Sequence, residues 1–70
     1  MNMNQRENAR IEFAGKAVQG LLANHVYTEY QARNAKSNKE FVKVIAADAV
    51  EMADALIAEL ERTEVKTISQ

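Results

Sequence analysis

Residues 37–62 have the sequence SNKEFVKVIAADAVEMADALIAELER, and this stretch decides the fold. Ser37 and Glu40 have capping-box spacing, in which a hydroxyl accepts from free backbone N–H groups while the acid reaches back. The apolar residues that follow recur every three or four positions, as on one face of a helix. They are Phe41, Ile45, Ala49, Met52, Leu56 and Leu60. The stretch predicts an amphipathic helix over residues 38–62, whose many alanines let a neighbouring helix approach closely.

A second amphipathic segment precedes this helix. Asn4 and Glu7 repeat the spacing of a cap and an acid, which predicts a first helix over residues 5–24. Its apolar side carries Ile11, Ala14, Val18, Leu21, Leu22 and His25. Gly15 and Gly20 are unfavourable in a helix by roughly 1 kcal/mol relative to alanine. Each glycine marks either the close approach of a partner backbone or a tolerated weak point.

The segment between the two helices allows two interpretations. A break near Asn24, with this residue capping the first helix in a left-handed conformation, leaves room for a short helix from Thr28. Alternatively, the first helix continues to Arg33 and the chain turns over residues 34–38. We favour the break. Residues 1–4 and 64–70 are expected to fray, as chain ends commonly do.

The length of 70 residues fits a single domain over residues 1–70 with a marginal core. A chain of this size buries only about 60% of its unfolded surface. Because cysteine is absent, disulfides and thiolate metal sites are excluded, and oligomerisation remains as the source of stability. We therefore expect an all-α helical hairpin that pairs into a homodimeric four-helix bundle. The residues expected to mediate self-association are Ile11, Val18, Leu21, Leu22, Phe41, Ile45, Met52, Leu56 and Leu60.

The charge pattern gives weak indications of partners. The net charge of −1 provides no overall field to attract nucleic acid or anionic lipid. Basic residues cluster around the expected turn, at Arg33, Lys36, Lys39 and Lys43, with tyrosines nearby that offer stacking surface. No apolar run approaches the roughly 20 residues that span a bilayer, and the polar start MNMNQREN does not resemble a signal peptide. A cytoplasmic location is the expectation.

The sequence offers little for catalysis or for binding a metal or cofactor. His25 and Glu29 share a helix face if the helix is continuous, but two ligands are too few for a metal site, and a structural histidine is favoured. Ser37 and Ser69 have no apparent base, and no glycine-rich phosphate loop is present. Asp48 lies within the apolar arc, where its carboxylate either reaches solvent or meets a ligand, His25 or its own copy. We expect no enzymatic activity, cofactor or small-molecule substrate.

Two segments resemble a group of short helical proteins from phages and prophages. They are EFAGKAVQGLLAN, residues 12–24, and AVEMADALIAELER, residues 49–62, which together cover 27 of the 70 residues. The connecting residues 25–48 are longer than in the pattern of that group, so nothing is carried over to them. The resemblance implies a helical protein, encoded by a virus or prophage and acting in the bacterial cytoplasm. It implies no particular activity.

We therefore expect a non-enzymatic interaction module that binds a protein partner, such as a host factor. The contact surface is expected around Tyr27, Tyr30 and Arg33 or on the exposed face of the second main helix, since tyrosines combine a large apolar ring with a polar tip. One alternative is a structural or assembly component of a phage particle that acts through self-association. Another is a weak nucleic-acid-binding accessory that uses the basic turn.

Overall fold

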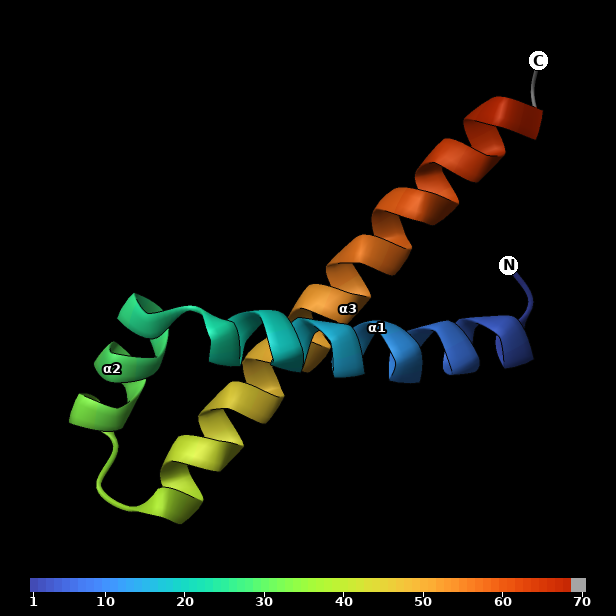
Figure 1. Ribbon diagram of the computed structural model, residues 1–70. Helices are drawn as coiled ribbons and strands as arrows, with labels where there is room; N and C mark the ends of the chain where they lie inside the picture. The colour runs from blue at the N-terminus through green and yellow to red at the C-terminus, as the bar shows by residue number, and fades with distance from the viewer. Residues whose placement is uncertain (69–70) are drawn as a thin grey trace.

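A computed structural model describes the backbone of residues 1–68 and the side chains of residues 1–63. Within this part the chain forms three helices: α1 (Met3–Ala23), α2 (His25–Asn34) and α3 (Asn38–Ile68). Figure 1 shows α1 crossing α3, with α2 at the end where the chain turns back. The all-α prediction is confirmed, and so are the break near Asn24 and the short middle helix.

The first helix begins earlier than predicted, because a capping box forms at Asn2 and not at Asn4. The Asn2 side chain accepts from the Gln5 backbone N–H at 2.8 Å, and the Gln5 side chain accepts from the Asn2 backbone N–H at 3.0 Å. This reciprocal pair satisfies two of the free donors at the helix start. Met3 and Asn4, which were expected to fray, therefore belong to the first turn of α1.

Asn24 ends α1 and begins α2. Its backbone N–H donates to the carbonyl of Leu21 at 3.1 Å, while its side chain accepts from the backbone N–H of Tyr27 at 3.0 Å. The expectation of a left-handed cap is wrong, because Asn24 has φ −86° and ψ 104°, an extended conformation typical of an N-cap. The short helix consequently starts at His25, three residues before the predicted Thr28.

The long helix α3 starts as predicted and ends later. The hydroxyl of Ser37 accepts from the backbone N–H of Glu40 at 3.2 Å, which is the cap that the sequence indicates. The helix then continues past the predicted end at Arg62 to Ile68. Arg62 pairs with Glu59 one turn earlier, at 2.6 Å, which supports the helix at the point where it was expected to end. The described backbone is helical over residues 64–68, where fraying was predicted, and residues 69–70 lie outside the described part.

Among the side chains that the structure describes, the buried core consists of four α3 residues spaced every four positions: Ile45, Ala49, Ala53 and Ile57. On α1, the half-buried residues Ala9, Phe13, Ala17 and Leu21 have the same spacing. When rows of this spacing interlock, two helices cross at about 50°, whereas helices of a four-helix bundle lie within about 20° of each other. Figure 1 shows the two long helices of the chain as a crossed pair, and the pairing of two copies into a four-helix bundle stays a prediction.

A crossed pair leaves the chain open. Its radius of gyration is 15.0 Å, against about 11 Å for a compact domain of this length. Its accessible surface is 5628 Å², against about 4,400 Å² for a compact monomer of this mass. Because α1 covers only the middle of the apolar stripe on α3, large apolar side chains on both helices remain exposed.

Candidate protein-interaction surfaces

Two separate apolar grooves lie beside the helix crossing, and they share no lining residue. We call the first the uncharged face. It comprises Ile11, Gly15, Val18 and Leu22 of α1 and Phe41, Val42 and Ala46 of α3. We call the second the acid-rimmed face. It comprises Met52, Ala55, Leu56 and Leu60 of α3, Leu21 of α1 and Tyr27 of α2, with Asp48 and Glu51 at its rim.

The uncharged face holds a groove of about 320 Å³. Its walls are Val18, Leu22, Phe41, Val42, Ile45 and Ala46, all of them apolar. Ile45, predicted to mediate self-association, is buried in the intramolecular core. Ile11 lies on the same side of α1 as Val18 and Leu22, because positions 11, 18 and 22 follow the period of a helix. Ile11, Leu22 and Val42 are 69%, 48% and 62% exposed, so this face of the single chain is in contact with water.

The acid-rimmed face holds a groove of about 370 Å³, and a row of apolar side chains continues from it along α3. Met52, Leu56 and Leu60 follow one another at four-residue steps and are 50%, 46% and 40% exposed. The sequence pattern placed these residues in one stripe with Ile45 and Ala49. In the structure the two groups separate. The row from Ile45 to Ile57 is buried against α1, whereas Met52, Leu56 and Leu60 lie beside it and stay exposed.

A hydrogen bond between Tyr27 and Asp48 holds α2 against α3. The hydroxyl of Tyr27 donates to the carboxylate of Asp48 at 2.5 Å. Partial burial raises the pKa of Tyr27 to about 12, and the hydrogen bond to the carboxylate contributes to the shift. Asp48 is half-buried, and its carboxylate accepts a hydrogen bond from Tyr27, a partner that the sequence analysis did not consider. Its partner lies 21 residues away, a separation for which the sequence carries no signal.

The three residues predicted to bind a partner do not form one cluster. Tyr27 packs within the chain at the end of the acid-rimmed groove. Tyr30 is 63% exposed on α2, and Arg33 is exposed in the last turn of that helix. His25 does not extend the apolar side of α1, because α1 ends at Ala23 and His25 begins α2 as an exposed residue. Among the described residues, no group of three or more His, Asp or Glu side chains could hold a metal ion.

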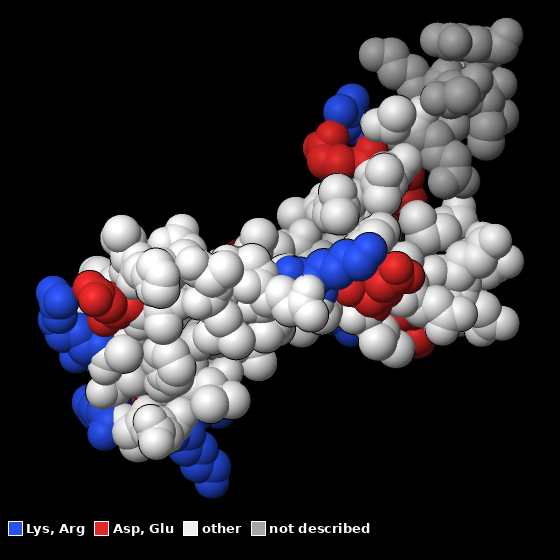
Figure 2. Space-filling model, viewed as in Figure 1, with Lys and Arg blue, Asp and Glu red and all other residues white. Residues whose placement is uncertain are grey.

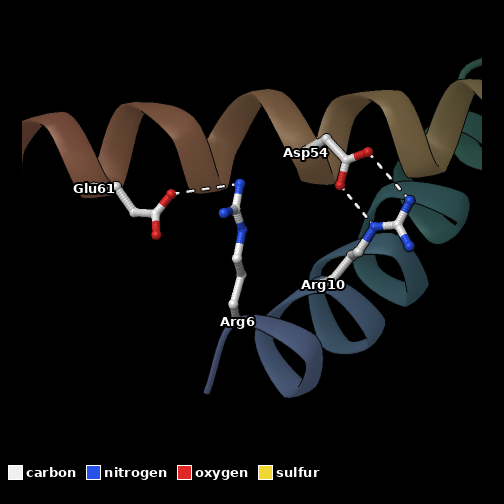
Figure 3. A network of polar contacts seen from close by, with 4 residues as sticks. All are labelled: Arg6, Arg10, Asp54 and Glu61. Carbon is white, nitrogen blue, oxygen red and sulfur yellow. Dashed lines mark hydrogen bonds and ion pairs between the residues drawn. The ribbon is translucent and has the colours of Figure 1, made fainter. Parts of the chain in front are cut away.

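Two ion pairs fix the crossing of α1 and α3 (Figure 3). Arg10 donates to both carboxylate oxygens of Asp54, at 2.7 and 3.2 Å, and Arg6 lies 3.6 Å from Glu61. The hydrogen bond from Arg10 holds the pKa of the Asp54 carboxyl below its ordinary value, and the same bond raises the pKa of Arg10. A hollow of about 430 Å³ adjoins these pairs. Since both guanidinium groups are already paired, we assign this hollow no ligand.

Basic side chains gather at the end of the molecule formed by α2 and the start of α3. Figure 2 shows them as blue patches at that end, beyond a largely white central surface. Arg33, Lys36, Lys39 and Lys43 are all exposed there. The predicted basic turn therefore exists as a surface feature. That it binds nucleic acid stays a prediction.

Comparisons with protein-family models, curated proteins and solved structures found no match for this chain. The resemblance to phage and prophage proteins accordingly stays a prediction. Over the residues that the structure describes, none of the helices combines the length and apolar character that crossing a membrane requires.

Proposed function

We propose that this chain is a non-enzymatic interaction module whose acid-rimmed face binds a helix of a protein partner, in keeping with the phage or prophage origin that its sequence resembles. The observation that carries the proposal is the exposed row of Met52, Leu56 and Leu60 beside the groove. Three apolar side chains at four-residue steps form one half of a helix-in-groove contact. The methionine adds a flexible side chain that adapts to a partner surface.

The charge beside this row indicates the chemistry of the partner. Between residues 48 and 61, α3 carries five acidic side chains and no basic one. Asp48 and Glu51 lie at the groove itself, and Glu51 is exposed. Complementary charge steers association and sets orientation. The partner is therefore an amphipathic helix with lysine or arginine beside its apolar side, and Tyr27 offers an aromatic anchor at the end of the groove.

Leu56→Asp tests this proposal, with Ala58→Asp as the matched control. Leu56 lies in the exposed row, whereas Ala58 is exposed on α3 outside it, so both variants gain the same charge on the same helix. Tagged wild-type and variant proteins are incubated with nuclease-treated bacterial lysate, and captured proteins are identified by mass spectrometry. A partner should bind wild type and Ala58→Asp, lose at least about tenfold in affinity for Leu56→Asp, and weaken as salt is raised.

Circular dichroism is the control for folding, since Leu56 is half exposed and its replacement should leave the helix content unchanged. If no captured protein distinguishes Leu56→Asp from Ala58→Asp, the acid-rimmed face is not a partner site and the proposal fails.

A structural component that acts through self-association is the second candidate. This candidate is supported by the two apolar faces of the chain, which share no lining residue and are both exposed to solvent. Chains that each have two different contact faces can form open assemblies that keep growing. A face that binds the same face of another copy instead gives a closed dimer. An assembly that grows in mass as concentration rises would favour this candidate over the interaction module.

A further inference from the structure

We propose that a second copy of this chain docks on the uncharged face, so that α1 of one copy crosses α1 of the other at Gly15 and closes a two-fold dimer. This inference goes beyond the proposed function, which uses the acid-rimmed face. The first support is the apolar character of the uncharged face. Every residue that lines its groove is apolar, and Ile11, Leu22 and Val42 are the large side chains that it exposes to water.

Gly15 is an independent support. Positions 11, 15, 18 and 22 share one side of α1, which places Gly15 within the apolar row of the uncharged face. A Cβ added at Gly15 would meet nothing within 4 Å, so no contact inside the chain requires a glycine there. Glycine weakens a helix relative to alanine, and the close approach of another backbone is one compensation for that cost. Both glycines of α1 have open space around them, but only Gly15 lies in the apolar row, so a second molecule docking on that row can supply this approach.

The absence of charge makes a copy of the same chain the fitting occupant. Around a two-fold axis the same patch of both subunits meets, so like charges near the axis are brought together. The uncharged face contains no ionisable side chain among its seven residues. The acid-rimmed face, by contrast, would bring Asp48 and Glu51 toward their own copies. A basic partner suits that face, and a second copy suits the uncharged one.

The chain as a whole exposes more surface than a compact monomer of its mass. The accessible surface of 5628 Å² exceeds that of a compact monomer by about 1,200 Å². A specific interface of standard size takes about 800 Å² from each partner. Docking a second copy would therefore remove about two thirds of this excess, and it would enlarge a core that, among the described side chains, holds two isoleucines and two alanines.

Analytical ultracentrifugation of the full chain tests the inference, with Gly15→Leu and Gly20→Leu as a matched pair. Both glycines lie in α1 with open space around them, but Gly20 is outside the row formed by residues 11, 15, 18 and 22. Leucine is a good helix former, so both variants should stay helical. The wild type and Gly20→Leu should sediment as dimers of the 7.8 kDa chain, and Gly15→Leu should weaken dimerisation at least about tenfold because its side chain collides with the partner helix.

Val42→Asp provides a second variant, because Val42 is exposed in the single chain and an added charge there should dissociate the dimer without unfolding it. A monomeric wild type at micromolar concentration would overturn the inference, and so would a Gly15→Leu or Val42→Asp protein that dimerises like wild type. Leu56→Asp should remain dimeric. If Leu56→Asp dissociates the dimer instead, the interface lies on the acid-rimmed face, and this inference is wrong whatever the fate of the partner proposal.

Discussion

At the scale of single residues, the Tyr27–Asp48 pair determines where α2 lies. The two side chains come from different helices, and their hydrogen bond closes one end of the acid-rimmed groove. Tyr27 thus has a structural role that its neighbour Tyr30, exposed on the same helix, does not share. Substitutions at these two tyrosines are therefore expected to differ, with Tyr27 affecting the position of α2 and Tyr30 affecting only contacts outside the chain.

Alkaline titration should reveal the Tyr27 hydrogen bond. The pKa of Tyr27 is raised from its ordinary value of 10.0 to about 12, so the folded state favours the neutral phenol. The stabilisation is complete below pH 10 and is lost as the pH rises through about 12. Tyrosinate absorbance should show a late step in wild type and in Tyr30→Phe, and this step should vanish in Tyr27→Phe. A late step that persists in Tyr27→Phe would contradict the assignment.

At the scale of helices, Asn24 is the point where one helix becomes two. Its backbone N–H satisfies a carbonyl at the end of α1, while its side chain satisfies a donor at the start of α2. The hydroxyl of Thr28 also donates to the carbonyl of Leu21, at 3.2 Å, which completes the corner. The corner turns α2 away from the line of α1 and places Tyr27 where it reaches Asp48.

Asn24→Ala should destabilise the protein by about 1 kcal/mol, because the first turn of α2 loses its side-chain acceptor. Asn24→Asp keeps an acceptor and should retain most of the stability. Chemical denaturation followed by circular dichroism measures both changes. Equal stability of wild type and Asn24→Ala would show that the Asn24 side chain contributes nothing to the corner.

At the scale of the whole molecule, the crossing of α1 and α3 decides which apolar residues are available. The crossing rests on a small core and on the ion pairs Arg10–Asp54 and Arg6–Glu61, of which the first has two hydrogen bonds. A crossed pair with so few buried side chains leaves both the uncharged face and the acid-rimmed face exposed. Both proposed interactions therefore follow from the same crossing.

Acid should weaken the crossing through Asp54. Its pKa is lowered from the ordinary value of 3.8 by the hydrogen bond from Arg10. The stabilisation is therefore present above pH 3.8 and is lost as the pH falls below that value through the folded-state pKa. Melting temperature measured across this range should fall more steeply for wild type than for Asp54→Asn, in which the titrating carboxylate is absent. Parallel curves for the two proteins would show that Asp54 does not contribute.

The sequence alone determined the local structure. Caps and hydrophobic periodicity act over three or four residues, so Ser37 with Glu40 marked the start of α3 and Asn24 marked the break. The start of α1 after Asn2 was not predicted. The capping box there is completed by the side-chain amide of Gln5, whereas the prediction relied on an acidic residue at that position. The end at Ile68 was missed because the polar and β-branched residues after Arg62 weaken a helix without stopping it.

Only the tertiary structure decided which apolar residues form the core and which form the candidate surfaces. Periodicity placed Ile45 and Leu56 in one stripe, but the crossing buries the row that ends at Ile57 and leaves Leu56 exposed. The Tyr27–Asp48 and Arg10–Asp54 contacts were likewise invisible, since nothing local in the chain encodes the distance between such residues. The physical reason is that hydrogen bonds along one helix depend on neighbouring residues, whereas a crossing angle depends on how two complete surfaces interlock.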